Sequence, residues 1–528
     1  MPAPAGGRPS SHRSIRTIEA PGNEDAVMKP TAETPVLTEQ RADSGATPGR
    51  PASASRRGHG LAPRGTGHVP ESPMFEGRFG RMFRRLPPLV LSEAEIIDLA
   101  GRMVERSPGD PGMDNPDVPS GYTFLGQFID HDITHDPSPL QVQRNDPDAL
   151  TNFRSPFFDL DSVYGRGPAD QPYLYDDHNP GRFLVTSRDG QLDLQRNAQE
   201  SAIIPDPRND ENLFVTHLQL TLQLFHNKVL DRLPQLRESG EVPEEDDFAA
   251  AQRIVRWHYQ WVVIHDFLRR VVGEETFADV LHSVPSTGRG RAVERPDLRH
   301  YRWRNNPFMP VEFSVAAYRF AHSMVRARYK FNTSVPELPI FTAEPIAESD
   351  PLTHLGGARA LPPGWQIEWR RSFPLGTDGV GPAPSRAIDP YLAPPLTELP
   401  EEAAEGIASL ARRNLTRGVS LGLPSGQAVA RAMGVQPLAD SQLEAPRRGA
   451  APLWYYILRE SEVLEGGRRL GPVGGRIVAE VFLGLLAADS SSYLSNDPGW
   501  KPTLEGDREG DFTMPDLIRF TGFGLGEV

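Results

Sequence analysis

The sequence predicts a mainly α-helical protein. Apolar residues recur at helical spacing in several long segments, strand-like alternation is rare, and no internal repeat is present. The length of 528 residues allows one large domain or several smaller ones. We predict one large domain over residues 71–500, with a C-terminal tail at 501–528. Residues 1–70 are rich in Pro, Ala, Gly, Ser and Arg, so we expect them to be disordered.

The composition excludes several classes of protein. A net charge of −14 argues against a nucleic-acid partner, which would need a basic surface. The absence of cysteine excludes disulfides, thiol catalysis and thiolate ligands. No apolar run approaches the roughly 18 residues that a membrane span needs. The N-terminus has arginines without a following apolar stretch, so we expect no secretory signal and a cytoplasmic location by default, with leaderless export as the alternative.

Seven segments carry helical signals. The first, residues 92–104, opens with Ser92 and Glu95 in the spacing of a capping box. The other predicted helices cover residues 121–136, 213–233, about 248–267, 312–325, about 407–413 and about 473–486.

The segment 121–136 carries the densest group of chemically active side chains. Gln127, Asp130, His131 and Asp132 lie within six residues, among apolar positions at helical spacing. Buried acids and histidines are costly unless they are paired, hydrogen-bonded or bound to a ligand. We therefore expect this helix to hold a cofactor, a metal ion, or both.

One interpretation of this helix is a zinc site. His131 and His135 are four residues apart and share a helix face, with Asp132 in the position of a general base. Pro137 ends the helix just after the second histidine, and no third ligand follows nearby.

A second interpretation separates the acids by direction, since consecutive helix residues point about 100° apart. Asp132 could then join Asp159 and Asp161 around a hard cation such as Ca²⁺. His131 would face a cofactor pocket, and His322, on a distant apolar helix, could ligate a metal from the far side. The structural alternatives are a solvated turn for the two later aspartates and a satisfied core histidine for His322.

Five motifs, taken in order, resemble those of the peroxidase–cyclooxygenase superfamily, the animal-type haem peroxidases, in a cysteine-free, bacterial-looking form. The resemblance extends over roughly residues 75–500. The motifs are Gly-Gln-Phe-Ile-Asp-His-Asp at 126–132, the Phe/Asp loop at 155–165, Asp-Pro-Arg-Asn-Asp-Glu-Asn at 206–212, Tyr-Arg-Phe-Ala-His at 318–322 and Asn-Leu-Thr-Arg at 414–417.

The resemblance implies a single haem-peroxidase domain with few short strands, a haem b cofactor and a bound Ca²⁺. The implied catalytic residues are Gln127, His131 and Arg208. The implied haem-binding residues are His322 as axial ligand, Asn414 behind it, Arg319 and Arg417 near the propionates, and Asp130 and Glu211 at the positions that form ester links. The implied calcium ligands are Asp132, Ser155, the backbone of Phe157, Asp159 and Asp161, the last of which stands where a serine is usual.

The function implied is reduction of H₂O₂ with oxidation of a small donor, whether phenolic, halide or other. A fatty-acid dioxygenase of the same superfamily is less favoured, because Arg319 occupies the position of its radical-forming tyrosine, three residues before the proximal histidine. A non-catalytic pseudo-peroxidase is the other alternative. The presence of both His131 and Arg208 argues against it.

Overall fold

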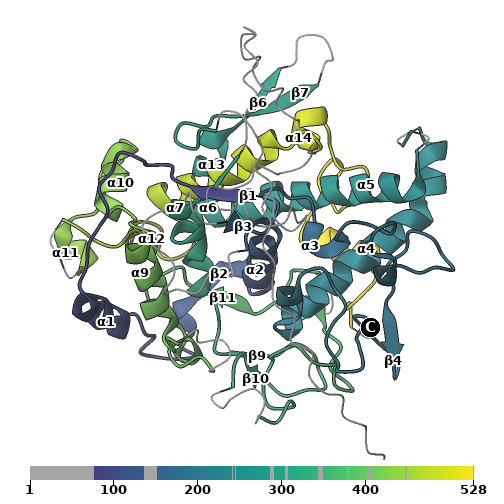
Figure 1. Cartoon of the computed structure of the whole chain (residues 1–528), viewed down its shortest axis with the longest axis horizontal. Helices are drawn as coiled ribbons and strands as arrows, with labels where there is room; N and C mark the ends of the chain where they lie inside the picture. The colour runs from purple at the N-terminus through teal and green to yellow at the C-terminus, as the bar shows by residue number, and fades with distance from the viewer. Residues whose placement is uncertain are drawn as a thin grey trace, which may run out of the picture. The chain divides into compact units, whose positions relative to one another are not determined.

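Helices supply most of the regular structure, as the sequence predicts (Figure 1). The computed structural model describes residues 77–526, except for 136–150, 241, 244, 286–290, 304–306, 343–348, 377, 378, 380, 401–405, 446 and 448. The segment predicted to be disordered, residues 1–70, lies outside the described residues. All described residues belong to one compact unit that begins at Ser55. Among the described helices, none is long and apolar enough to cross a membrane.

The helix α2, Gly121–Ile133, is the central element (Figure 1). It packs against α4, Leu213–Glu238, and against the π-helical turn η5, Val262–Leu268. It begins at Gly121, whose N–H donates to Ser372 O over 2.9 Å. A Cβ at this position would lie 2.7 Å from that carbonyl oxygen, so only glycine lets the helix start this close to the neighbouring backbone.

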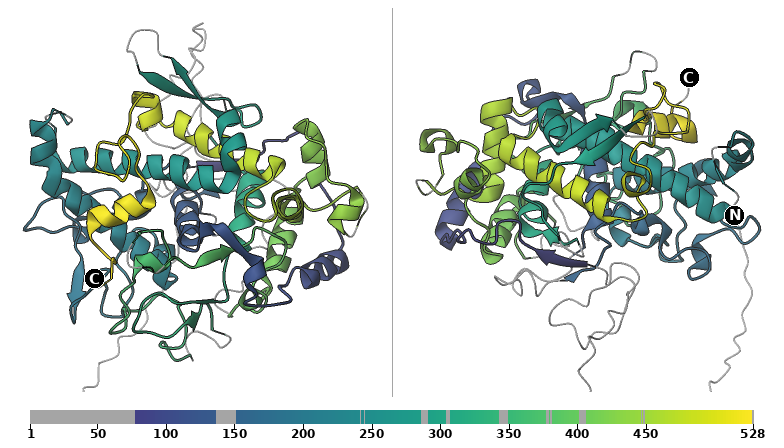
Figure 2. Two further views of the ribbon diagram at one scale, coloured as in Figure 1. Left: turned by 180° about the vertical axis from the view of Figure 1, so that it is seen from behind. Right: turned by 90° about the horizontal axis from the view of Figure 1, so that it is seen from above.

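Two long helical stretches flank α2. The helix α4 starts at the cap residue Asn212, whose Oδ1 accepts hydrogen bonds from Phe214 N and Val215 N. The second stretch runs through α5, Asp247–Trp261, the turn η5 and α6, Arg269–Val280, and so extends well beyond the predicted 248–267. Figure 2 shows α13, Pro472–Ala488, alongside α6, against which it packs.

The C-terminal part of the chain adds a second group of helices. The helix α9, Leu410–Ser420, is longer than the predicted 407–413, and α12, Leu453–Glu465, was not predicted. The stretch predicted as a tail includes α15, Met514–Thr521, which packs against α4. The remaining helices are α1 (Glu93–Arg102, with the predicted capping box), α3 (Asp161–Tyr164), α7 (Val311–Ser314), α10 (Gly426–Ala432), α11 (Asp440–Leu443) and α14 (Tyr493–Asn496).

The strands are few and short, as predicted. One sheet of three strands has the order β3-β1-β8, and the others are two-stranded. The described strands are β1 (Gly77–Gly80), β2 (Asp114–Pro119), β3 (Thr151–Asn152), β4 (Thr186–Arg188), β5 (Gln191–Asp193), β6 (Leu281–Pro285), β7 (Ala292–Pro296), β8 (Met309–Pro310), β9 (Arg328–Tyr329), β10 (Leu338–Pro339) and β11 (Pro384–Arg386).

The predicted helix at 312–325 is wrong as a continuous α-helix. The chain forms α7, leaves helical geometry at Ala316 (φ −128°, ψ −72°), and continues as the 3₁₀ helix η6, Ala317–His322. The break is stabilised by Arg319, whose Nε donates to Ser314 O over 3.0 Å. A 3₁₀ helix has three residues per turn, so residues three apart point the same way.

The predicted helix at 121–136 ends three residues early. Thr134 is extended (φ −136°, ψ 137°), because the chain turns there toward β3. The N–H of His135 donates to Asn152 Oδ1 over 2.8 Å, and its carbonyl accepts from Phe153 N. His131 and His135 are therefore not on one helix face, and the geometry of a helical zinc pair is absent.

Candidate functional site

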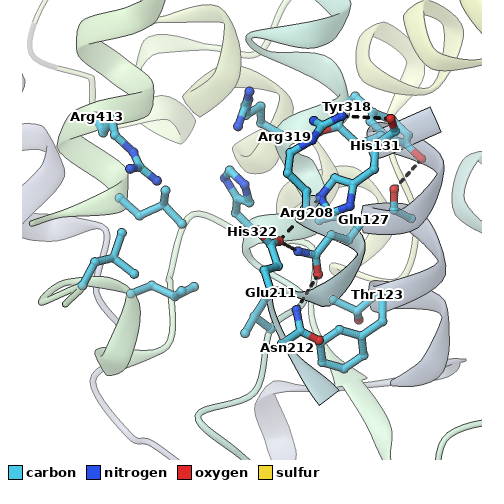
Figure 3. A pocket seen from close by; sticks show the side chains of 18 of the residues that line it. Thr123, Gln127, His131, Arg208, Glu211, Asn212, Tyr318, Arg319, His322 and Arg413 are labelled. Carbon is cyan, nitrogen blue, oxygen red and sulfur yellow. Dashed lines mark hydrogen bonds and ion pairs between the residues drawn. The ribbon is translucent and has the colours of Figure 1, made fainter. Parts of the chain in front are cut away.

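A cavity of about 660 Å³ lies between α2, the start of α4, the α7–η6 segment and α9. This volume is within the range of about 300–1,000 Å³ that is usual for ligand and cofactor sites. Its lining combines apolar side chains with many polar ones, and the polar side chains come from distant parts of the chain (Figure 3). The apolar lining includes Val311, Val315, Ala321, Val325, Ile340, Leu396, Leu399, Leu410 and Leu421.

His131 is the central polar residue of the α2 wall. Its side chain is buried, with Nδ1 2.9 Å from Asn209 Oδ1 and Nε2 3.5 Å from Glu211 Oε1. Its carbonyl oxygen accepts a hydrogen bond from Arg208 Nη2 over 2.9 Å. The imidazole is thus held from behind and presents Nε2 to the cavity.

Arg208 lies on the 3₁₀ turn η4, Pro207–Asp210, directly before α4. The Asp206 carboxylate caps this turn by accepting from Arg208 N, and it also accepts from the guanidinium, with Nη2 at 2.7 Å. Burial alone would raise the pKa of Asp206, but the guanidinium groups of Arg208 and Arg154 hold it well below its usual range. The carboxylate is therefore ionised and fixes the orientation of Arg208.

Gln127 faces the cavity one turn before His131 on α2 (Figure 3). Its Nε2 donates to Glu211 Oε1, and its Oε1 accepts from Asn212 Nδ2 over 3.2 Å. Asp130 also lines the cavity, with Oδ1 accepting from Thr134 Oγ1. The predicted distal residues are thus brought together by α2 and the segment 206–212.

His322, at the end of η6, lines the same cavity from the α9 side. Its Nδ1 lies 2.8 Å from Nδ2 of the buried Asn414 on α9. Burial lowers the pKa of His322 well below its usual value, and three neighbouring arginines lower it further. The imidazole is therefore neutral, as a metal-ligating histidine must be.

The three arginines around His322 give this end of the cavity a positive charge. Arg319 and Arg417 were predicted here, and Arg413 was not. Arg413 lies one turn before Arg417 on α9, so the helical spacing on the α9 face was the signal that could have identified it. The cluster suits an anionic group on a ligand.

A second group of acids lies on the other side of α2. Carboxylate oxygens of Asp132, Asp159 and Asp161 are all within 4.8 Å of one another, the only such group of potential metal ligands in the described part of the chain. Asp132 is fully buried and accepts from Ser162 Oγ over 3.1 Å. The backbone between the two later aspartates is not extended, because Leu160 is left-handed (φ 57°) and α3 begins at Asp161.

Two other predicted ligands lie on the loop beside these acids. Ser155 is fully buried, and its N–H lies 3.5 Å from Asp161 Oδ2. Phe157, predicted to contribute its backbone, is partly buried in the same loop. Burial raises the pKa of Asp132 to about 8, and repulsion from Asp159 adds to this effect. Three acids in such proximity form an oxygen-rich donor set that suits a hard cation.

His135 is placed apart from any further metal-ligating group. It lines the cavity, but burial, together with the positive charge of Arg208, lowers its pKa to about 4. Among the described residues, no group of three potential metal ligands includes a histidine.

Several residues that shape the site have no signal in the local sequence. Arg154 donates to Asp206 Oδ2 through Nε over 2.9 Å, and its Nη1 lies 3.5 Å from Asp161 Oδ1. The loop 354–358 closes one side of the cavity and is held by Gly357 N, which donates to Glu211 O over 2.9 Å. These contacts join segments that are far apart in sequence.

The chain belongs to the animal haem peroxidase family. The family model matches residues 138–443, which is more than half of the chain. The matched stretch includes Arg208, His322 and Asn414 and ends before α12, while α2 precedes it. The cavity described above is therefore the candidate haem site of a family member.

The individual relatives have low sequence identity to this chain. The peroxidasin homolog pxn-2 of Caenorhabditis elegans is 24% identical over 298 residues, a match that covers 52% of this chain and 20% of the relative. The chain thus spans about a fifth of that protein's length.

Among solved structures, peroxidase A of Dictyostelium discoideum shares the fold with a TM-score of 0.61 at 16% identity, covering 85% of this chain and 94% of that one. A fatty acid α-dioxygenase of Oryza sativa follows with a TM-score of 0.51 at 15% identity, covering 83% and 78%.

The raised pKa of Asp132 predicts a pH-dependent stability. With the cluster empty, the folded state binds a proton that the unfolded chain releases above about pH 4, so the thermal midpoint should fall as pH rises toward about 8. Ca²⁺ should reverse this loss, adding about 2.7 kcal/mol at one hundred times its Kd. Calorimetry with a chelator and with Ca²⁺ measures both effects.

The variant Asp132→Asn should lose the Ca²⁺ response and part of the pH dependence. Asp389 provides the control, because it is a buried carboxyl outside the cluster whose pKa burial raises to about 7. Asp389→Asn should keep the Ca²⁺ response. A Ca²⁺ response of equal size in Asp132→Asn would contradict the assignment.

Proposed function

We propose that this protein is a haem-dependent peroxidase that reduces H₂O₂ and oxidises a small donor such as a phenol or a halide. The observation that carries the proposal is the single cavity with His131 and Arg208 on one wall and the His322–Asn414 pair facing the same space. Membership of the animal haem peroxidase family supports it.

The residues around the cavity fit haem. The aliphatic lining suits the macrocycle, and the positive end formed by Arg319, Arg413 and Arg417 suits its two propionates. His322 would bind iron through Nε2, which is available only when the proton is on Nδ1. In that state the Asn414 amide would turn its oxygen toward Nδ1 and accept this proton's hydrogen bond.

The distal residues would move one proton during peroxide cleavage. Haem, when bound, would supply the redox-active iron needed to reduce the peroxide. His131 Nε2 would accept the proton from the inner oxygen of H₂O₂ and return it to the outer oxygen, which leaves as water. Arg208, held in place by Asp206, would stabilise the negative charge that develops on the leaving oxygen. Gln127 would orient the peroxide.

Asp130 and Glu211 are proposed to form ester links with haem methyl groups. Each link would replace a methyl C–H bond by a C–O bond, a two-electron oxidation for which H₂O₂ would be the oxidant and be reduced to water. Both carboxylates line the cavity, and Glu211 Oε1 reaches the Gln127 amide on α2. After extraction with acid, mass analysis should show either haem of increased mass or haem that remains attached to the protein. Recovery of free haem b alone would remove this part of the proposal.

The acid cluster is proposed to bind Ca²⁺ through Asp132, Ser155, the backbone of Phe157, Asp159 and Asp161. Asp132 directly follows His131, so a cation held there would fix the register of the helix that carries the base. The ion would stabilise the structure and would not take part in the reaction.

Fatty-acid dioxygenation is the second candidate, because fatty acid α-dioxygenases share the fold. The arrangement of η6 argues against it. Arg319, not a tyrosine, shares the face of His322, and Tyr318 is tied to α2 by donating to Gly126 O over 3.0 Å. Rapid oxygen uptake with a fatty acid would reverse this preference.

Three histidine variants test the proposed function. His322→Ala should lose most haem binding, because the axial ligand is gone. His131→Ala should keep haem but react with H₂O₂ more slowly by a factor of about 100 or more, which is the usual contribution of a general acid–base residue. Stopped-flow absorption of the haem-loaded variants measures both properties.

His135→Ala is the matched control, since His135 also lines the cavity but has no role in proton transfer. It should retain haem and the wild-type rate with peroxide. Normal peroxide turnover by both His322→Ala and His131→Ala would contradict the proposal, and equal losses in His131→Ala and His135→Ala would favour a shared metal site instead.

A further inference from the structure

Two buried amides form a hydrogen-bonded chain behind His131. Asn209, the residue after Arg208, is fully buried, and its Oδ1 lies 2.9 Å from His131 Nδ1. Its Nδ2 donates to Oε1 of Gln219 on α4 over 2.8 Å, and Gln219 is also fully buried. Loss of either of these two buried hydrogen bonds would be costly, because water would not replace it.

The donors and acceptors in this series of hydrogen bonds matter for the protonation of His131. In the structure Asn209 Nδ2 donates to Gln219 Oε1, so the atom that faces His131 is Oδ1, which can only accept. Among the described residues, Gln219 Nε2 has no hydrogen-bond partner of its own. A hydrogen bond to Asn209 Oδ1 therefore requires the His131 proton to be on Nδ1, and the neutral ring then keeps its lone pair on Nε2. Nε2 is the nitrogen on the cavity side, 3.5 Å from Glu211 Oε1.

We propose that Asn209 is the positioning residue that makes His131 a base at Nε2, because Asn209 Oδ1 accepts the hydrogen bond of the Nδ1 proton. A reversed amide would donate Nδ2 to His131 Nδ1 and leave the ring proton on Nε2, where it blocks proton uptake. The inference deepens the proposed peroxidase function and rests on it.

Charged and titratable groups also approach His131 from the neighbouring segments. These are Arg208 at its carbonyl oxygen, Asp206 behind that guanidinium, Glu211 at Nε2, and His135, which lies beyond the end of α2. Their contacts are made with the backbone or with the cavity side of the ring. Asn209 is the residue in contact with His131 Nδ1. Substitutions of Asn209 should therefore change the hydrogen bond of the Nδ1 proton and leave the contacts of the other groups in place.

Two substitutions at Asn209 should move the pH profile in opposite directions. Asn209→Leu removes the acceptor, so kcat/KM for H₂O₂ should fall about 10–100-fold. The charged form of the ring also loses a hydrogen bond, so the acidic limb of the profile should move to lower pH. Asn209→Asp keeps an acceptor and adds a negative charge, so the acidic limb should move to higher pH by about one unit or more.

The measurement is stopped-flow reaction of the haem-loaded full-length protein with H₂O₂ as a function of pH, with the haem absorption band confirming an intact pocket. Gln223→Leu is the matched control, because Gln223 is a buried amide one turn further along α4 that does not line the cavity. It should give the wild-type profile.

A purely structural role for Asn209 would lower activity without moving the acidic limb, or would move it in the same direction in both variants, and either result overturns the inference. If wild-type protein reacts with peroxide and His131→Ala does not, the proposed function stands, and either of these results overturns the Asn209 assignment alone. If haem-loaded wild-type protein does not react with peroxide, the proposed function fails and this inference fails with it.

Discussion

The buried carboxylate of Asp206 is the interaction on which the candidate site depends. It is fully buried between Arg208 and Arg154, with guanidinium nitrogens of both at 2.7 Å. Burying such charges costs several kcal/mol per ion, and only close pairing with satisfied hydrogen bonds offsets that cost. The same carboxylate caps the turn η4, so the pairing fixes the backbone and the side chain of Arg208 together.

This ion-pair network also connects two side chains of α2, His131 and Asp132, that point in different directions. Arg154 extends from Asp206 to Asp161 of the acid cluster, while Arg208 extends from Asp206 to the carbonyl of His131. His131 and Asp132 are adjacent in sequence, yet one faces the cavity and the other the acids. A cation at the acid cluster would therefore stabilise the same short segment that presents the proposed base.

Features of the fold and the candidate site could be predicted from the sequence where they depend on residues close together in the chain. The helix α2, its polar residues and the capping box of α1 follow from spacing within a few residues, and the five motifs include both histidines that line the cavity. The 3₁₀ geometry of η6 could not be predicted, because Val, Ala and Ala at 315–317 are compatible with a continuous helix and the break is fixed by tertiary contacts. The roles of Arg154, Asn209 and Gln219 were also out of reach, since each depends on a side chain in another segment whose position only the fold determines.

We expect the cavity to hold haem through His322 and to react with peroxide on the side of His131. The most direct measurement is the absorption spectrum of the purified full-length protein, first titrated with haem and then treated with H₂O₂. We expect saturable binding, a haem absorption band displaced from that of free haem, and a rapid spectral change with peroxide that a reducing donor reverses. A spectrum that stays that of free haem, or bound haem that does not respond to peroxide, would contradict this expectation.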